Sequence, residues 1–313
     1  MKNFPLVSVL VLCGAAVAHA CDSCAIAIAT GETRAGFILS ATEQFTHLGS
    51  LRLDGSRSAN PAGQFLNSAI AHLNLGYSDG GRWAYQLTLP YIQRSFRRPE
   101  DDGIERGTES GWGDAVAVAR CAVQGNATVN SAWQVGVFGG VKFATGSASR
   151  IAEELSETED GNGVPSGIHG HDLTLGSGST DALVGVDGRW NAGRYFAGGS
   201  AQYSVRSKGK YDYRFANEFL WSAHAGWYAA LTHEYSVAIA AVLSGENKGR
   251  DTFAGETAED TGMNACYLGP RVALTAGDRW GADFAMEWPV RQHNTALQAV
   301  ADYRWRAGAT LRF

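Results

Sequence analysis

The sequence predicts an all-β protein, a transmembrane antiparallel β-barrel of about 12 strands with long extracellular loops and short periplasmic turns. Three observations lead to this fold class. Apolar and polar residues alternate with a period of two in segment after segment, and the connections between segments are long and short in turn. Beyond residue 20, no stretch approaches the ~18 uninterrupted apolar residues of a transmembrane helix. Strands that cross a bilayer must close into a barrel, because lipid offers no hydrogen-bond partner to an open edge.

The alternation is clear in the segment 82–94. Its odd-numbered positions from 83 to 91 are apolar or aromatic, with leucines at Leu87 and Leu89 and aromatic residues toward the ends at Trp83 and Tyr91. A lipid-facing aliphatic band between two aromatic girdles has this arrangement. The predicted strands are 34–48, 64–78, 82–96, 112–123, 130–143, 173–190, 194–206, 214–229, 235–245, 263–275, 280–291 and 297–313.

The connections support the same topology. Tight turns such as 79–81, 191–193 and 276–279 are expected on the periplasmic rim, and the loops 97–111 and 144–172 are expected outside. The connection 292–296 breaks the rhythm, because it is short where a long loop is due.

The first 20 residues have the pattern of a secretory signal peptide. Lys2 precedes the apolar stretch 4–17, and Ala18-His19-Ala20 forms an A-x-A cleavage site. The predicted organisation is a signal peptide at 1–20, a periplasmic N-terminal segment at 21–33 and a transmembrane β-barrel at 34–313.

The mature chain is expected to begin at Cys21, which forms a C-x-x-C motif with Cys24. A disulfide between the two is compatible with export. A soft-metal or redox contact and lipidation of Cys21 are the alternatives, although two thiolates alone do not complete a metal site. Ala25 stands where haem attachment requires His. Cys121 and Cys266 fall on separate predicted strands, where thiols behave as small apolar groups.

The last segment, 297–313, ends in an aromatic residue. Its odd positions, Ala299 and Ala301 among them, are expected to face lipid, and even positions such as Arg304 to face inward. A last strand ending in Phe313 resembles the signal by which the barrel assembly machinery recognises its substrates. The resemblance implies that this machinery is a partner, together with outer-membrane lipid.

Charged side chains on the inward face of the strands are expected to line the lumen. A soluble all-β protein is the alternative fold, but so many inward charges would be costly in a packed core. Ion pairs across neighbouring strands and a conduction path both fit the mixture of signs. The predicted lumen-lining residues are Arg82, Arg94, Lys142, Asp181, Arg206, Glu218, Asp283, Glu287, Arg291, Asp302, Arg304 and Arg306.

Several classes of function are disfavoured. The net charge of -5 and the absence of a basic run argue against nucleic acid as a partner. Signatures of the Rossmann fold and the P-loop are missing, so we expect no cofactor. The histidines are scattered, and none forms a defensible pair with a serine, so the sequence predicts that the protein is not an enzyme. A barrel-wall hydrolase is the alternative.

The loop 144–172 is too long for a mere connection and is expected to be functional. It contains several carboxylates, such as Glu153 and Asp160, and closes with His169 and His171. Two imidazoles with nearby carboxylates are a candidate divalent-metal site. A solvated acidic surface loop is the alternative.

Four short signatures suggest a family. They are LPY at 89–91, GWGD at 111–114, GVKFATG at 140–146 and LGSGSTD at 175–181. In this order the chain resembles the family of outer-membrane transporters of the meta-pathway of phenol degradation. The resemblance implies a channel of the bacterial outer membrane for small hydrophobic or aromatic molecules. The alternative is a structural or sensing barrel whose N-terminal cysteines contact a periplasmic redox or metal partner.

The glycines of the last signature have a physical interpretation. Gly176 and Gly178 permit the close approach of a neighbouring backbone or an inserted loop, or a bend at the barrel wall.

Overall fold

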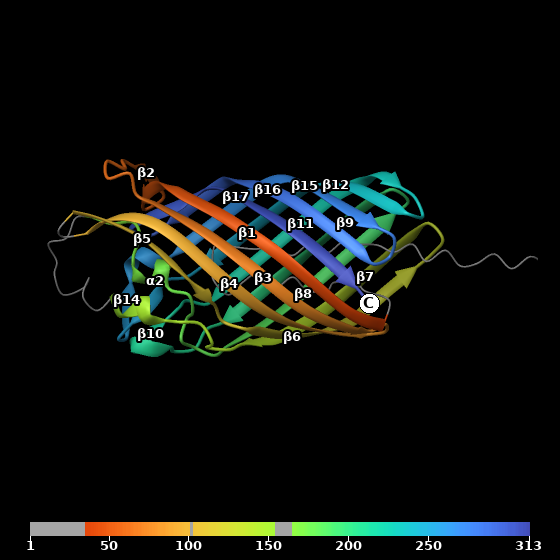
Figure 1. The fold of residues 1–313 in the computed structure, drawn as a ribbon, viewed down its shortest axis with the longest axis horizontal. Coiled ribbons are helices and arrows are strands. Elements are labelled where there is room, and N and C mark those ends of the chain that lie inside the picture. The colour runs from red at the N-terminus through yellow and green to blue at the C-terminus, as the bar shows by residue number, and fades with distance from the viewer. Residues whose placement is uncertain (1–34, 101–102, 154–164) are drawn as a thin grey trace, which may run out of the picture.

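The computed structural model describes residues 35–100, 103–153 and 165–313, in which 12 antiparallel strands form a closed barrel (Figure 1). The predicted fold class is confirmed, and each predicted segment overlaps one of these strands. They are β1 (Ala35–Leu53), β3 (Phe65–Asp79), β4 (Trp83–Glu100), β6 (Val116–Ala127), β7 (Ser131–Lys142), β8 (Asp181–Ala192), β9 (Tyr195–Val205), β11 (Glu218–Leu231), β12 (Tyr235–Lys248), β15 (Met263–Ala276), β16 (Trp280–Asn294) and β17 (Leu297–Arg312).

Closure joins the first strand to the last. β1 pairs with β3 on one side and with β17 on the other, from Ile38 opposite Arg312 to Leu53 opposite Leu297. Each of the 12 barrel strands therefore pairs with two neighbours, so the ring of these strands is closed.

The loops carry further short elements that the alternation did not predict. β5 extends the wall by pairing with the second half of β4, and β2 pairs with the end of β1. β10, β13 and β14 form a separate small sheet. The bounds are β2 (Ser56–Ser58), β5 (Gly103–Trp112), β10 (Tyr213–Arg214), β13 (Asp251–Phe253), β14 (Glu256–Ala258), η1 (Ser149–Glu153), α2 (Gly170–Leu173), η2 (Lys210–Asp212) and η3 (Glu259–Thr261).

The barrel wall is apolar outside and polar inside. In β4, Trp83, Leu87 and Tyr91 are exposed on the outer face, whereas Gln86 and Thr88 between them are buried. This distribution inverts that of a soluble protein and suits a wall surrounded by lipid. Within the described ranges, no helix is both long and apolar enough to span a membrane.

A β-bulge in the last strand corrects one prediction. Opposite β1 the register passes from Tyr303 directly to Ala301, which leaves Asp302 as an extra residue. One extra residue reverses the side-chain alternation beyond it. Ala299 and Ala301 are buried rather than facing lipid, as is Val300 between them.

The position of Arg291 and the start of β8 also differ from the prediction. A shift in the β15–β16 register, where Cys266 opposes Arg291 and Tyr267 opposes Pro289, leaves Arg291 exposed. The strand predicted from residue 173 begins at Asp181, because residues 174–180 return from the long loop.

The lipid-facing assignment has a direct test. In a background without native cysteines, Leu87→Cys and Val137→Cys should resist a membrane-impermeant thiol reagent, because both side chains are exposed only on the outer wall. Val129→Cys is the control, since the side chain of Val129 is fully exposed in the turn before β7. Equal labelling of all three cysteines in proteoliposomes would contradict the membrane-embedded wall.

Candidate functional site

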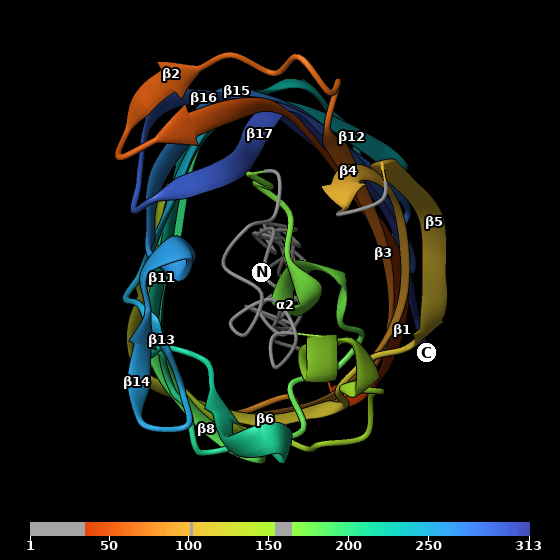
Figure 2. The same cartoon turned by 90° about the vertical axis from the view of Figure 1, so that its left-hand side faces the viewer.

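The long loop between β7 and β8 enters the barrel. Viewed along the axis, η1 and α2 lie inside the ring of strands (Figure 2). Backbone contacts bind the loop to the wall, since Gly167 accepts a hydrogen bond from the N–H of Ala299 at 2.7 Å and donates one to Gln64 Oε1 at 2.9 Å. Arg94 of β4 donates to the carbonyl oxygens of Asp172 and Thr174. The loop is therefore built into the barrel mouth.

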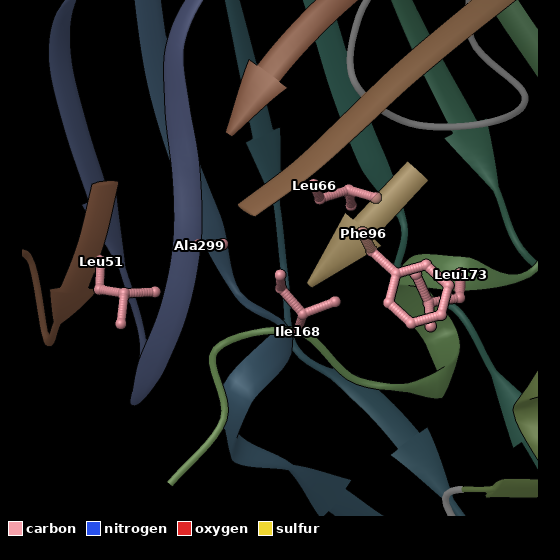
Figure 3. Close-up of a cluster of buried hydrophobic side chains, with 6 residues drawn as sticks. All are labelled: Leu51, Leu66, Phe96, Ile168, Leu173 and Ala299. Atoms are coloured by element: carbon pink, nitrogen blue, oxygen red, sulfur yellow. The ribbon is translucent and has the colours of Figure 1, made fainter. Parts of the chain in front are cut away.

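Two apolar loop side chains anchor it. Ile168 and Leu173 are completely buried against wall residues of β1, β3, β4 and β17 (Figure 3). Burying one such side chain contributes about 1.5–3 kcal/mol. The wall residues of this cluster are Leu51, Leu66, Phe96 and Ala299.

One carboxylate fixes the two ends of the loop. Asp114 accepts hydrogen bonds from the N–H of Gly146 at 2.9 Å and from the N–H of Ser177 at 2.8 Å. The two ends pass at close range, because a Cβ added to Gly176 would lie 2.6 Å from the carbonyl carbon of Gly146. At Gly176, the glycine of the last signature thus permits the close backbone approach that the sequence suggested.

Asp114 also begins a buried line of alternating charges around the wall. Lys142 Nζ lies 2.9 Å from Asp114 and 2.8 Å from Asp181, and Arg206 lies 3.1 Å from Asp181 and 3.2 Å from Glu218. All five residues are at most 4% exposed. Each charge borders one of opposite sign, which offsets the cost of removing it from water. Four predicted lumen residues are brought together here.

A second group, which we name the lumen partition, lies deeper. It consists of Ser244, Tyr267, Glu287 and Arg304. Arg304 Nε lies 2.6 Å from Glu287, and the guanidinium carbon is 3.8 Å from the ring centroid of Tyr267. Ser244 joins the pair through hydrogen bonds of 2.5 Å from Arg304 and 3.2 Å to Glu287.

A cavity of about 120 Å³, the mouth cavity, lies between the loop and this partition. Apolar side chains such as Leu66, Met263 and Ala301 line one part of it, and Arg94 and Glu218 line another. Further charged side chains in the lining are Glu246 and Lys248, so the cavity combines apolar and polar groups, as ligand sites do.

A smaller cavity of about 20 Å³, the mid-lumen pocket, lies beyond the partition. On β17 the mouth cavity contacts Ala301, whereas the mid-lumen pocket contacts Arg304 and Arg306, so the pocket is deeper along the strand. Its lining residues are Gln44, Ser222, His224, Val242, Arg271, Ala285, Glu287, Arg304, Trp305 and Arg306.

The other predicted lumen residues have separate positions. Arg82 and Arg291 are exposed. Asp283 lies 3.4 Å from both Arg271 and Arg306. Asp302 sits in the bulge, where it accepts hydrogen bonds from the N–H of Gly49 and the hydroxyl of Ser50.

The predicted lumen set missed several buried polar residues. Asp187 forms a bidentate pair with Arg120 at 2.7 and 2.6 Å, and Arg271 lines the mid-lumen pocket. Alternation could have found Asp187, because it has the same parity as Asp181. Alternation could also have placed Arg271 on the same side of its strand as Tyr267, because both positions are odd-numbered.

The two loop histidines stack on each other, with ring centroids 5.8 Å apart, and His169 Nε2 lies 3.2 Å from Asp260. Within the described part of the chain, no group of three or more His, Cys, Asp or Glu residues could hold a metal ion. The acidic residues 154–160 lie outside that part, so the metal site stays a prediction. Cys21 and Cys24 also lie outside it, and Cys121 and Cys266 are free.

Comparison with known proteins supports the fold. No family model and no curated protein matches the sequence. A crystal structure of an outer-membrane channel from Pseudomonas putida F1 matches with a TM-score of 0.63 and 14% identity, over 89% of this chain and 96% of the channel. The β domain of the Bordetella autotransporter BrkA matches with a TM-score of 0.46 and 13% identity, over 90% of this chain and 100% of that domain.

The fold therefore belongs to the class of bacterial outer-membrane β-barrels. The matched protein is described as a channel. Because the two sequences are only 14% identical, the likeness is restricted to the fold.

Proposed function

We propose that this protein is a channel of the bacterial outer membrane that passes small hydrophobic or aromatic molecules. The mouth cavity is the observation that carries the proposal, because it places apolar side chains inside a polar barrel, below an inserted loop. An apolar engineered cavity of roughly 150 Å³ binds benzene. A cavity of about 120 Å³ is therefore of the order needed for one small ring.

The surroundings of the cavity suit selection rather than free diffusion. The loop is held by Ile168, Leu173 and Arg94, and the partition lies on the inner side. A solute meets a confined, partly apolar site between two barriers. A site inside a channel must bind its solute favourably and still release it.

Filling the cavity should block the function. Ala301→Phe introduces a ring into the mouth cavity, and overpacking of about 1–3 kcal/mol should weaken the binding of benzyl alcohol by roughly tenfold. Binding is measured by calorimetry on the full barrel in nanodiscs, with single-channel conductance recorded in planar bilayers. Ala309→Phe is the matched control, because Ala309 is exposed on the same strand.

The outcomes separate two functions. Weaker binding in Ala301→Phe than in Ala309→Phe supports passage through the mouth cavity. An intact barrel without conductance or binding of benzyl alcohol would instead favour a structural or sensing barrel with a periplasmic redox or metal partner.

A further inference from the structure

The mid-lumen pocket has an excess of positive charge. Three guanidinium groups and one carboxylate line it among the described residues. These groups belong to Arg271, Arg304, Arg306 and Glu287. Glu287 is engaged by Arg304 at 2.6 Å. Glu246 also interacts with Arg304, but from the side of the mouth cavity, so the lining of the pocket itself has three guanidinium groups and one carboxylate.

The second carboxylate nearby is shared. Asp283 lies 3.4 Å from Arg271 Nε and 3.4 Å from Arg306 Nη2. Charge-assisted hydrogen bonds of this kind are usually about 2.7–2.9 Å long. Arg306 thus meets this carboxylate at a longer range than such a bond requires, which leaves its charge incompletely balanced in the pocket.

Buried polar atoms also point to a missing acceptor. His224 is 6% exposed and Arg304 is 2% exposed. Neither ring nitrogen of His224, nor Nη1 of Arg304, has a hydrogen-bond partner among the described residues. Arg304 Nη1 is a donor, and a neutral imidazole donates through one of its two nitrogens. A buried donor without a partner costs about 1–3 kcal/mol, which a ligand that accepts hydrogen bonds recovers. Charge and hydrogen bonding therefore select the same kind of ligand, an anion.

The size of the pocket restricts which part of a ligand enters. A volume of about 20 Å³ admits one small group, since about 10–15 Å³ holds a water molecule. The larger, partly apolar mouth cavity lies on the other side of Arg304 and Tyr267. These two cavities suit a molecule whose small anionic end enters the mid-lumen pocket while its compact apolar body stays in the mouth cavity.

We propose that the mid-lumen pocket is a carboxylate-binding subsite and that the solutes of the channel are small monocarboxylates with an apolar or aromatic body. The proposal rests on the channel function above and names its substrate class. The planar guanidinium groups of Arg304 and Arg306 present paired donors that match a carboxylate. On entry the solute competes with Glu287 for Arg304, so its binding is reversible, as passage requires.

The test compares benzoate with benzyl alcohol, which has a similar body without the charge. Both are titrated by calorimetry at pH 7.5 into the full barrel in nanodiscs. We expect benzoate to bind more tightly than benzyl alcohol. Arg306→Gln should weaken benzoate binding by about tenfold or more, the loss of a hydrogen bond between charged groups, and leave benzyl alcohol unaffected.

Two variants complete the design. Asp283→Asn removes the shared carboxylate from Arg271 and Arg306, and should tighten benzoate binding severalfold. Arg291→Gln removes the same charge from an exposed position of β16 and should leave benzoate binding unchanged. If Arg306→Gln fails to fold, the Asp283→Asn variant decides.

Each outcome has one meaning. A conducting barrel that binds benzoate no better than benzyl alcohol overturns the carboxylate subsite and leaves the channel in place. The subsite is equally overturned if Arg306→Gln behaves like Arg291→Gln, or if Asp283→Asn leaves the affinity for benzoate unaltered. An intact barrel that neither conducts nor binds either probe overturns the channel function itself.

Discussion

Replacing residues 148–174 by two glycines is expected to raise the single-channel conductance by roughly twofold or more, because it removes the loop from the barrel mouth. The ends are already placed for the connection. Ser147 O accepts a hydrogen bond of 3.1 Å from the N–H of Leu175, which is the bond that closes a β-turn around two central residues. Asp114 still holds Gly146 and Ser177 in the shortened chain.

The same deletion should weaken any preference for cations. It removes six acidic residues and one basic residue from the loop sequence, and charge near a channel entrance attracts ions of opposite sign at low salt. Conductance and reversal potential are measured in planar bilayers, after heat-dependent gel mobility has shown that the barrel is folded. A folded variant with the conductance of the wild type would show that the loop is no constriction.

Lys142→Met is expected to destabilise the barrel by about 3–5 kcal/mol, because it leaves two buried carboxylates without their shared cation. Lys142 is 1% exposed and lies between Asp114 and Asp181. Unfolding in urea, followed by tryptophan fluorescence in lipid vesicles, measures the loss. Adding Asp114→Asn to Lys142→Met should restore part of it, since Asp181 still pairs with Arg206.

A matched control exists on the surface. Lys208 lies 2.8 Å from Asp212, but both side chains are more than half exposed. Lys208→Met should therefore change the stability by only about 0–1 kcal/mol. If Lys142→Met and Lys208→Met lose similar amounts of unfolding free energy, the line of charges that begins at Asp114 does not stabilise the barrel.

The sequence alone predicted the strands well, because period-two alternation records which side of each strand meets lipid. It could not predict the positions of Ala299 and Ala301, since a bulge has no signature in composition and reverses everything beyond it. The sequence also did not show that the loop between β7 and β8 folds into the barrel. Ile151, Ile168 and Leu173 were apolar signals in it, but most of their partners are distant in the sequence.

The candidate site was predictable to a similar degree. Parity identified Lys142, Asp181 and Arg206 as inward residues, and the structure joins them in one line. The excess charge of the mid-lumen pocket depends on which carboxylate reaches which guanidinium group. Such pairing is a property of neighbouring strands in three dimensions.

The bulge at Asp302 also affects how the solute site can change. The alanines beyond it belong to a strand whose apolar residues suit lipid, and the extra residue turns them toward the mouth cavity. Small apolar side chains of this kind suit a lipid-facing surface and the lining of an apolar cavity equally well. Insertion or deletion of a single residue at this point changes how residues 298–301, which all line the cavity, are presented to it. Solute preference in this fold can thus be rewritten by a change of register, with every neighbouring amino acid kept.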